Sequence, residues 1–94
     1  MFEKEAARAL EKALHEKAFN AKTLQEWLEF PPKPELGHLA FPCHKLAPAL
    51  KKAPNQIAQE LARAMKKEKW LREVQAQGPY LNFFFESNFF RELN

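Results

Sequence analysis

Three side chains in the last quarter of the sequence have the types and spacing to bind an unstacked nucleobase. Tyr80 and Asn82 lie two residues apart, and Gln77 precedes them across a Gly-Pro pair. Side chains of a strand alternate between its faces, so Tyr80, Asn82 and Phe84 are predicted to share one exposed face. An aromatic ring offers a stacking surface, and an amide donates to and accepts from a base edge. The segment from Gln77 to Phe85 is therefore the leading candidate for a binding surface.

The same strand also has a purely structural interpretation. Tyr80 and Phe84 can lie beneath a helix packed on the second face of the sheet, and Asn82 can satisfy the backbone of the neighbouring turn. The residue pattern leaves both interpretations open. The alternate residues of the strand are predicted to form the core: Leu81, Phe83 and Phe85.

Basic residues concentrate in the middle of the chain, where they can follow a phosphate backbone. The sequence has 15 Lys and Arg against 12 Asp and Glu, a net charge of +3, which is too mild to identify the partner. The candidate phosphate contacts are Lys45, Lys51 and Lys52. Glu60 and Glu68 interrupt the basic set, so a solvated helix surface explains it equally well.

Neither a catalytic set nor a metal site is expected. Cys43 and His44 are adjacent, but sequence neighbours rarely face each other and no acidic residue lies nearby to orient the imidazole. Adding His38 still leaves an incomplete tetrahedral set. A single cysteine fits a reducing compartment, and no signal peptide or membrane-length apolar run is evident. We expect a cytoplasmic protein with no membrane contact, no metal and no cofactor in this chain.

The first half of the chain is predicted to supply one helix and two strands. Apolar residues recur at three and four from Phe2 to Ala18, which indicates an amphipathic helix. The segment from Thr23 to Phe30 suits a strand or a helical turn, and we assign a strand. A proline-rich loop follows over 31–37, and Leu39 to Cys43 forms a second, edge-like strand.

The second half is predicted to contain helices followed by a hairpin. A short helix over 44–52 precedes a longer one that Pro54 opens. Two strands, over 70–77 and 80–85, flank Gly78-Pro79, and a last helix from Ser87 carries Phe89, Phe90 and Leu93. Residues 1–94 thus read as one α+β domain, a two-layer sandwich with an α-β-β-α-β-β core and helices on one sheet face. We expect the chain to continue beyond Asn94.

Five motifs taken together resemble the N-terminal additional domain of arginyl-tRNA synthetase over nearly the whole chain. Pro31 and Pro34 precede Gly-His-Leu-Ala at 37–40, and Leu46-Ala47 with Lys51 follows. Pro-Asn-Gln-Ile-Ala-Gln-Glu-Leu at 54–61 and Gly-Pro-Tyr-Leu-Asn-Phe at 78–83 complete the order.

The resemblance implies a domain that holds the elbow of tRNA(Arg) and contacts an exposed D-loop nucleotide. Carried over by motif, the contacting residues are Gln77, Tyr80 and Asn82. Arginine, ATP and catalysis then belong to a catalytic domain of the same chain beyond this segment. Many family members have Asp after the glycine where this chain has His38, which puts any role of that acidic residue in doubt. The alternative is a protein-docking or structural appendage without RNA readout, suggested by the apolar Phe89 and Phe90.

Overall fold

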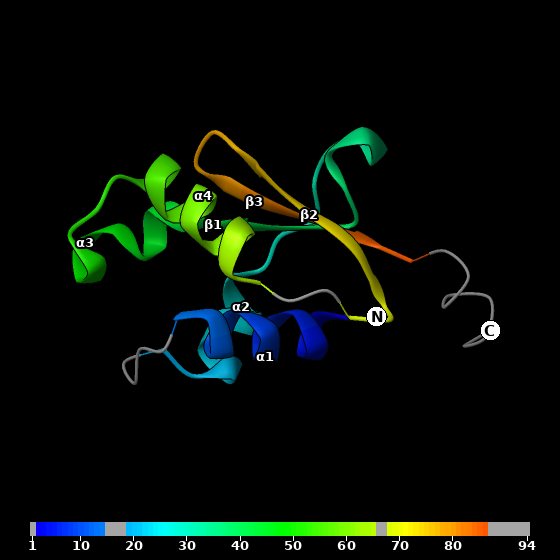
Figure 1. Ribbon diagram of the computed structural model, residues 1–94, viewed down its shortest axis with the longest axis horizontal. Helices are drawn as coiled ribbons and strands as arrows, with labels where there is room; N and C mark the ends of the chain where they lie inside the picture. The colour runs from blue at the N-terminus through cyan, green and yellow to red at the C-terminus, as the bar shows by residue number, and fades with distance from the viewer. Residues whose placement is uncertain (1, 15–18, 66–67, 87–94) are drawn as a thin grey trace.

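The computed structural model describes residues 2–14, 19–65 and 68–86, and these form a helical layer against one face of a three-stranded sheet (Figure 1). The antiparallel strands are ordered β1 (Leu39–Pro42), β3 (Tyr80–Phe85) and β2 (Leu71–Gln77). The three longer helices are α1 (Glu3–Leu14), α2 (Ala21–Trp27) and α4 (Pro54–Ala64). The α+β sandwich with helices on one sheet face is confirmed.

The segment predicted as the first strand, Thr23 to Phe30, is instead mostly helix, so that prediction was wrong. Asn20, which lies before the segment, caps α2: its Oδ1 accepts a hydrogen bond from the Thr23 backbone N–H at 2.9 Å. Within the segment only Glu29 pairs as a strand residue does, in an isolated bridge with Ala40. The observed order is therefore α-α-β-α-α-β-β, in which the second element is a helix and not the predicted strand.

The remaining helices follow the sequence pattern closely. Pro54 occupies the first turn of α4, where its missing N–H is not needed, and the apolar stripe of that helix is buried. The short helix predicted over 44–52 is divided into η2 (Cys43–Lys45) and α3 (Ala47–Leu50), and α3 ends at Lys51 in the left-handed conformation. Part of the predicted first helix, 15–18, and the whole predicted last helix lie outside the described residues.

The hairpin of β2 and β3 also agrees with the prediction. Gly78 has φ +57°, as the first central residue of a type II′ turn requires, and the register places Gln77 opposite Tyr80. The face of the sheet that meets the helices carries the predicted apolar set. Its fully buried side chains are Leu39, Phe41, Leu81, Phe83 and Phe85.

The second face of the sheet is covered by a loop, which contradicts one prediction. Asn82 and Phe84 were expected to be exposed, but they are only 3% and 8% accessible. The loop between α2 and β1, which includes η1 (Pro34–Leu36), lies on the opposite side of the strands from α1 and α2 (Figure 1). Periodicity within β3 cannot reveal this cover, because the loop is distant in sequence.

Gly37 and His38 attach the end of this loop to β3. Gly37 has φ +105°, and a Cβ built there would lie 2.7 Å from the Phe83 carbonyl oxygen, so no larger residue fits without a shift. The His38 N–H donates to that same carbonyl at 2.8 Å. The Phe85 N–H donates to His38 Nδ1 at 3.0 Å, and the imidazole stacks on the Phe85 ring. The His38 side chain thus provides an acceptor for the Phe85 N–H, which lies beyond the first residue of β1 in the sheet.

Gly37→Ala is expected to lower the free energy of unfolding of the chain by about 3 kcal/mol, because left-handed strain and a backbone clash combine. Gly78→Ala is the matched control: Gly78 also has positive φ, but a Cβ added there would meet nothing within 4 Å. That change should cost about 1 kcal/mol. Urea unfolding of both variants measures the difference, and equal losses would show that the loop contact is not tight.

Acidification is expected to weaken this attachment. Desolvation and the nearby Arg72 charge lower the pKa of His38 from its usual 6.5, and its neutral Nδ1 accepts the Phe85 hydrogen bond. The folded state therefore binds the proton less readily than the unfolded state, so stability present above pH 6.5 is lost as pH falls through the lowered pKa. Urea midpoints between pH 7.5 and 5 measure this. His38→Asn should flatten the profile, and an unchanged profile in that variant would contradict the role given to His38.

Candidate nucleic-acid interface

The three predicted contact residues meet in one groove on the second face of the sheet. Gln77, Tyr80 and Asn82 line a groove of about 370 Å³ between the hairpin and the covering loop. The sequence alone grouped these three residues, but it did not reveal the opposite wall. That wall and part of the floor come from other segments: Glu29, Phe30, Pro31, Pro32, Leu36 and Ala40.

The floor of the groove is a cross-strand pair of unequal size. Ala40 on β1 is opposite Asn82 on β3, and paired residues of antiparallel strands project from the same face. Ala40 contributes only a methyl group, which is largely buried and lies among the residues that line the groove. The Glu29 N–H and carbonyl bond the Ala40 backbone at 2.9 and 2.8 Å, which holds the wall beside this floor.

Two side-chain amides form a hydrogen-bonded pair at the base of the groove. Asn82 Nδ2 donates to Gln77 Oε1 at 3.0 Å, which fixes the buried amide without a backbone partner. Among the described residues no protein group occupies the Asn82 carbonyl oxygen or the Gln77 amino group. An acceptor and a donor are therefore presented side by side, the set that one edge of a base can match. The structural interpretation that Asn82 serves the turn backbone is not what is observed.

The groove carries little positive charge. Its lining contains no Lys or Arg among the described residues, and the exposed Glu29 is its one carboxylate. A phosphate seated there would meet a like charge and no cation. A neutral planar group, half apolar and half hydrogen-bonding, matches the lining better.

The candidate phosphate contacts lie on the helical side of the molecule, away from this groove. Lys45 Nζ is 5.6 Å from the centroid of the Trp27 ring, and Trp27 in turn packs toward Phe41 in the core. Lys52 Nζ forms an ion pair with Glu60 Oε1 at 2.7 Å. Lys51 is exposed. The structure does not bring these lysines together with the amide pair, and their contact with phosphate stays a prediction.

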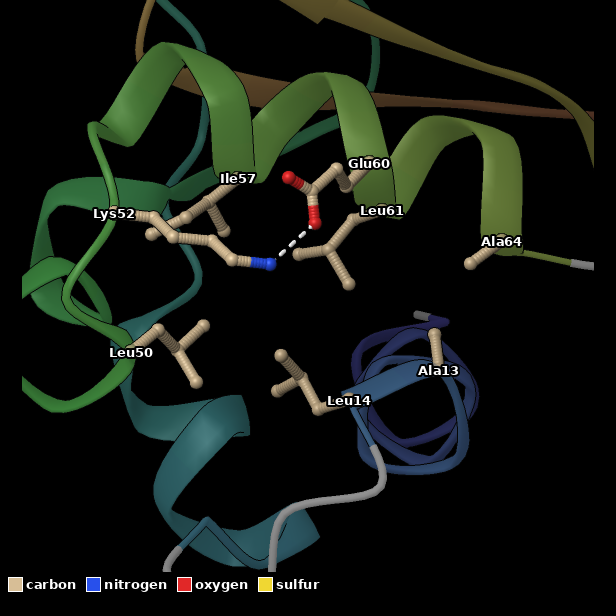
Figure 2. A pocket seen from close by; sticks show the side chains of 8 residues that line it. All are labelled: Ala13, Leu14, Leu50, Lys52, Ile57, Glu60, Leu61 and Ala64. Atoms are coloured by element: carbon tan, nitrogen blue, oxygen red, sulfur yellow. Dashed lines mark hydrogen bonds and ion pairs between the residues drawn. The ribbon is translucent and has the colours of Figure 1, made fainter.

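A second hollow, of about 240 Å³, lies between α1 and α4 on the helical side. Figure 2 shows Leu14, Leu50 and Leu61 around it, with the Lys52–Glu60 ion pair reaching across one side. The two charged groups neutralise each other, and no other polar side chain of the described residues lines the hollow. It lacks the convergent hydrogen-bonding groups of a ligand site.

The predicted inertness of Cys43 agrees with its surroundings. The thiol is buried, its Sγ lies 3.8 Å from the Phe41 carbonyl oxygen, and desolvation raises the pKa of Cys43 to about 12. The reactive thiolate is therefore suppressed. Within 2–14, 19–65 and 68–86, no group of three metal-ligating side chains comes together, and no helix has the length and apolarity of a membrane span.

The residue that sequence reasoning missed is Phe30. The sequence pattern assigns it to the end of a strand, yet its side chain is exposed and borders the groove. The sequence held one sign that Phe30 lies outside a helix, which is its position before Pro31. A residue before proline is held extended and cannot continue a helix.

Comparison with known families gives a match over most of the chain. Residues 4–85 match the family described as the arginyl tRNA synthetase N terminal domain. The arginine–tRNA ligase of Clostridium perfringens is 51% identical over 65 residues, covering 69% of this chain and 11% of that protein. The arginine–tRNA ligase of Clostridium kluyveri is 40% identical over 91 residues, covering 97% of this chain and 15% of that protein.

A solved structure shares the fold. Thermus thermophilus arginyl-tRNA synthetase aligns with a TM-score of 0.76 and 28% identity, over 98% of this chain and 15% of that chain. The chain therefore spans about 11 to 15% of the length of these relatives.

Proposed function

The chain belongs to the arginyl-tRNA synthetase N-terminal domain family, and we propose that it is the tRNA-binding part of an arginine–tRNA ligase. In this proposal the groove receives an exposed D-loop nucleotide at the elbow of tRNA(Arg). The observation that carries it is the meeting of Gln77, Tyr80 and Asn82 in one groove. The family resemblance suggests these three residues, and their position in one groove supports the proposal.

Each of the three residues has a distinct part in holding the base. Tyr80 lies half-buried at the start of β3 and supplies a ring for stacking, worth about 1 to 3 kcal/mol per base. Asn82 presents its carbonyl to the base edge, and Gln77 both fixes that amide and presents its own amino group. Looped-out bases are recognised by this combination of stacking and edge hydrogen bonds.

The chain itself is non-catalytic in this proposal. Arginine and ATP are used by a catalytic domain of the same protein, and this domain positions the tRNA so that its acceptor end reaches that site. Lys45, Lys51 and Lys52 contact phosphates on the flank of the tRNA. Such contacts add affinity that falls with salt and carries no base information.

Tyr80→Ala in the full-length ligase is expected to weaken tRNA(Arg) binding by about 5- to 150-fold, because one stacking contact is lost. The KM for tRNA should rise, whereas the KM values for arginine and ATP should not change. Tyr80→Phe keeps the ring and should bind nearly as tightly as the native enzyme. Filter binding and aminoacylation kinetics measure both variants.

Ala40→Leu tests the groove without altering any of the three contact residues. The larger side chain fills the space above the floor, so tRNA affinity should fall about as far as with Tyr80→Ala. If neither variant changes affinity or aminoacylation, the proposal is wrong and the docking or structural alternative replaces it. The apolar Phe89 and Phe90, on which that alternative rests, lie outside the described residues.

A further inference from the structure

Phe30 is the one large apolar side chain that is exposed among the residues described, with 77% of its surface accessible. It borders the same groove as Tyr80 and Asn82. Neither the Phe30 ring nor the Tyr80 ring contacts another aromatic ring in the described part of the chain. Two unpartnered rings thus border one groove, one on β3 and one on the covering loop.

The backbone holds Phe30 at this position. On one side, Glu29 is fixed to Ala40 by two backbone hydrogen bonds of 2.9 and 2.8 Å. On the other side, Pro31 restricts Phe30 to extended conformations. The backbone that carries the ring is therefore held beside the groove, and the exposed ring borders it. A site held in its binding geometry before the ligand arrives loses less entropy on binding.

The lining makes a flat neutral group the natural occupant between the two rings. Asn82 and Gln77 offer hydrogen bonds at the base, and Glu29 disfavours an anion. A nucleobase has two π-faces and one hydrogen-bonding edge. One ring stacks on a single face only, so Tyr80 alone leaves the second face of the base in water.

We infer that Phe30 is a second stacking residue, which covers the face of the tRNA base opposite Tyr80. This inference rests on the proposed function and extends it to the loop wall, which the Gly-Pro-Tyr-Leu-Asn motif does not include. Phe30 thereby contributes to the affinity for the base, and this contribution is larger for bases that stack more strongly.

A double-mutant cycle between the protein and the tRNA tests this contact. Full-length ligase carrying Phe30→Ala, Phe30→Leu or Phe30→Trp is titrated against tRNA(Arg) and against tRNAs with an abasic site at each unpaired D-loop position in turn. Tyr80→Ala is measured in parallel. Because Phe30 is exposed, its substitution should leave the thermal unfolding midpoint nearly unchanged.

Phe30→Ala is expected to weaken binding of native tRNA by about 5- to 150-fold, with Phe30→Leu intermediate and Phe30→Trp at least as tight as native. With one particular abasic tRNA the effects of Phe30→Ala and Tyr80→Ala should both disappear, which identifies one shared base. If only the Tyr80→Ala effect disappears there, Phe30 does not stack and the inference is overturned, while the proposed function stands. If neither variant is sensitive to any abasic site, both the inference and the proposed function are wrong.

Discussion

The structure depends on the close contact of Gly37 with the Phe83 carbonyl on the central strand. β3 is covered on both faces, by helices on one side and by the loop on the other. The helices need only an apolar surface, which β3 supplies at alternate residues. The end of the loop is held on β3 by the tight backbone approach of Gly37 and by the hydrogen bonds of His38. Together with the bridge between Glu29 and Ala40 at the start of the loop, that approach holds the wall of the groove in place.

His38 gives a physical meaning to the departure from the family pattern. Where the family resemblance leads us to expect aspartate after this glycine, the imidazole Nδ1 accepts the Phe85 N–H. A carboxylate can accept the same hydrogen bond, so the acceptor role is preserved while the charge is not. The aromatic ring adds stacking on Phe85, which lies near Phe2 and Trp70. Position 38 therefore supports the sheet end here, and no part in ligand binding is needed to explain it.

Local signals allowed much of the fold to be predicted from the sequence. The helix opened by Pro54 and the hairpin at Gly78-Pro79 each depend on residues within a few positions. The segment from Thr23 to Phe30 was misassigned because its deciding residue, Asn20, lies outside the apolar pattern. The cap is a single hydrogen bond from one residue. An argument from the alternation of apolar and polar residues takes no account of such a bond. The sequence placed Gln77, Tyr80 and Asn82 near one another, but it did not predict the burial of Asn82, which arises from a loop forty or more residues away. Burial by a distant loop depends on tertiary structure, and the alternation of residues within one strand does not predict it.

The loop is attached to the sheet by contacts at its two ends. Glu29 pairs with Ala40 at its start, and Gly37 with His38 contacts Phe83 and Phe85 at its end, all but one of these hydrogen bonds through the backbone alone. Residues 30–36 can consequently change in character while the sheet beneath them stays intact. Different side chains can thus form this wall of the groove without any change in the backbone hydrogen bonds that attach the loop to the sheet.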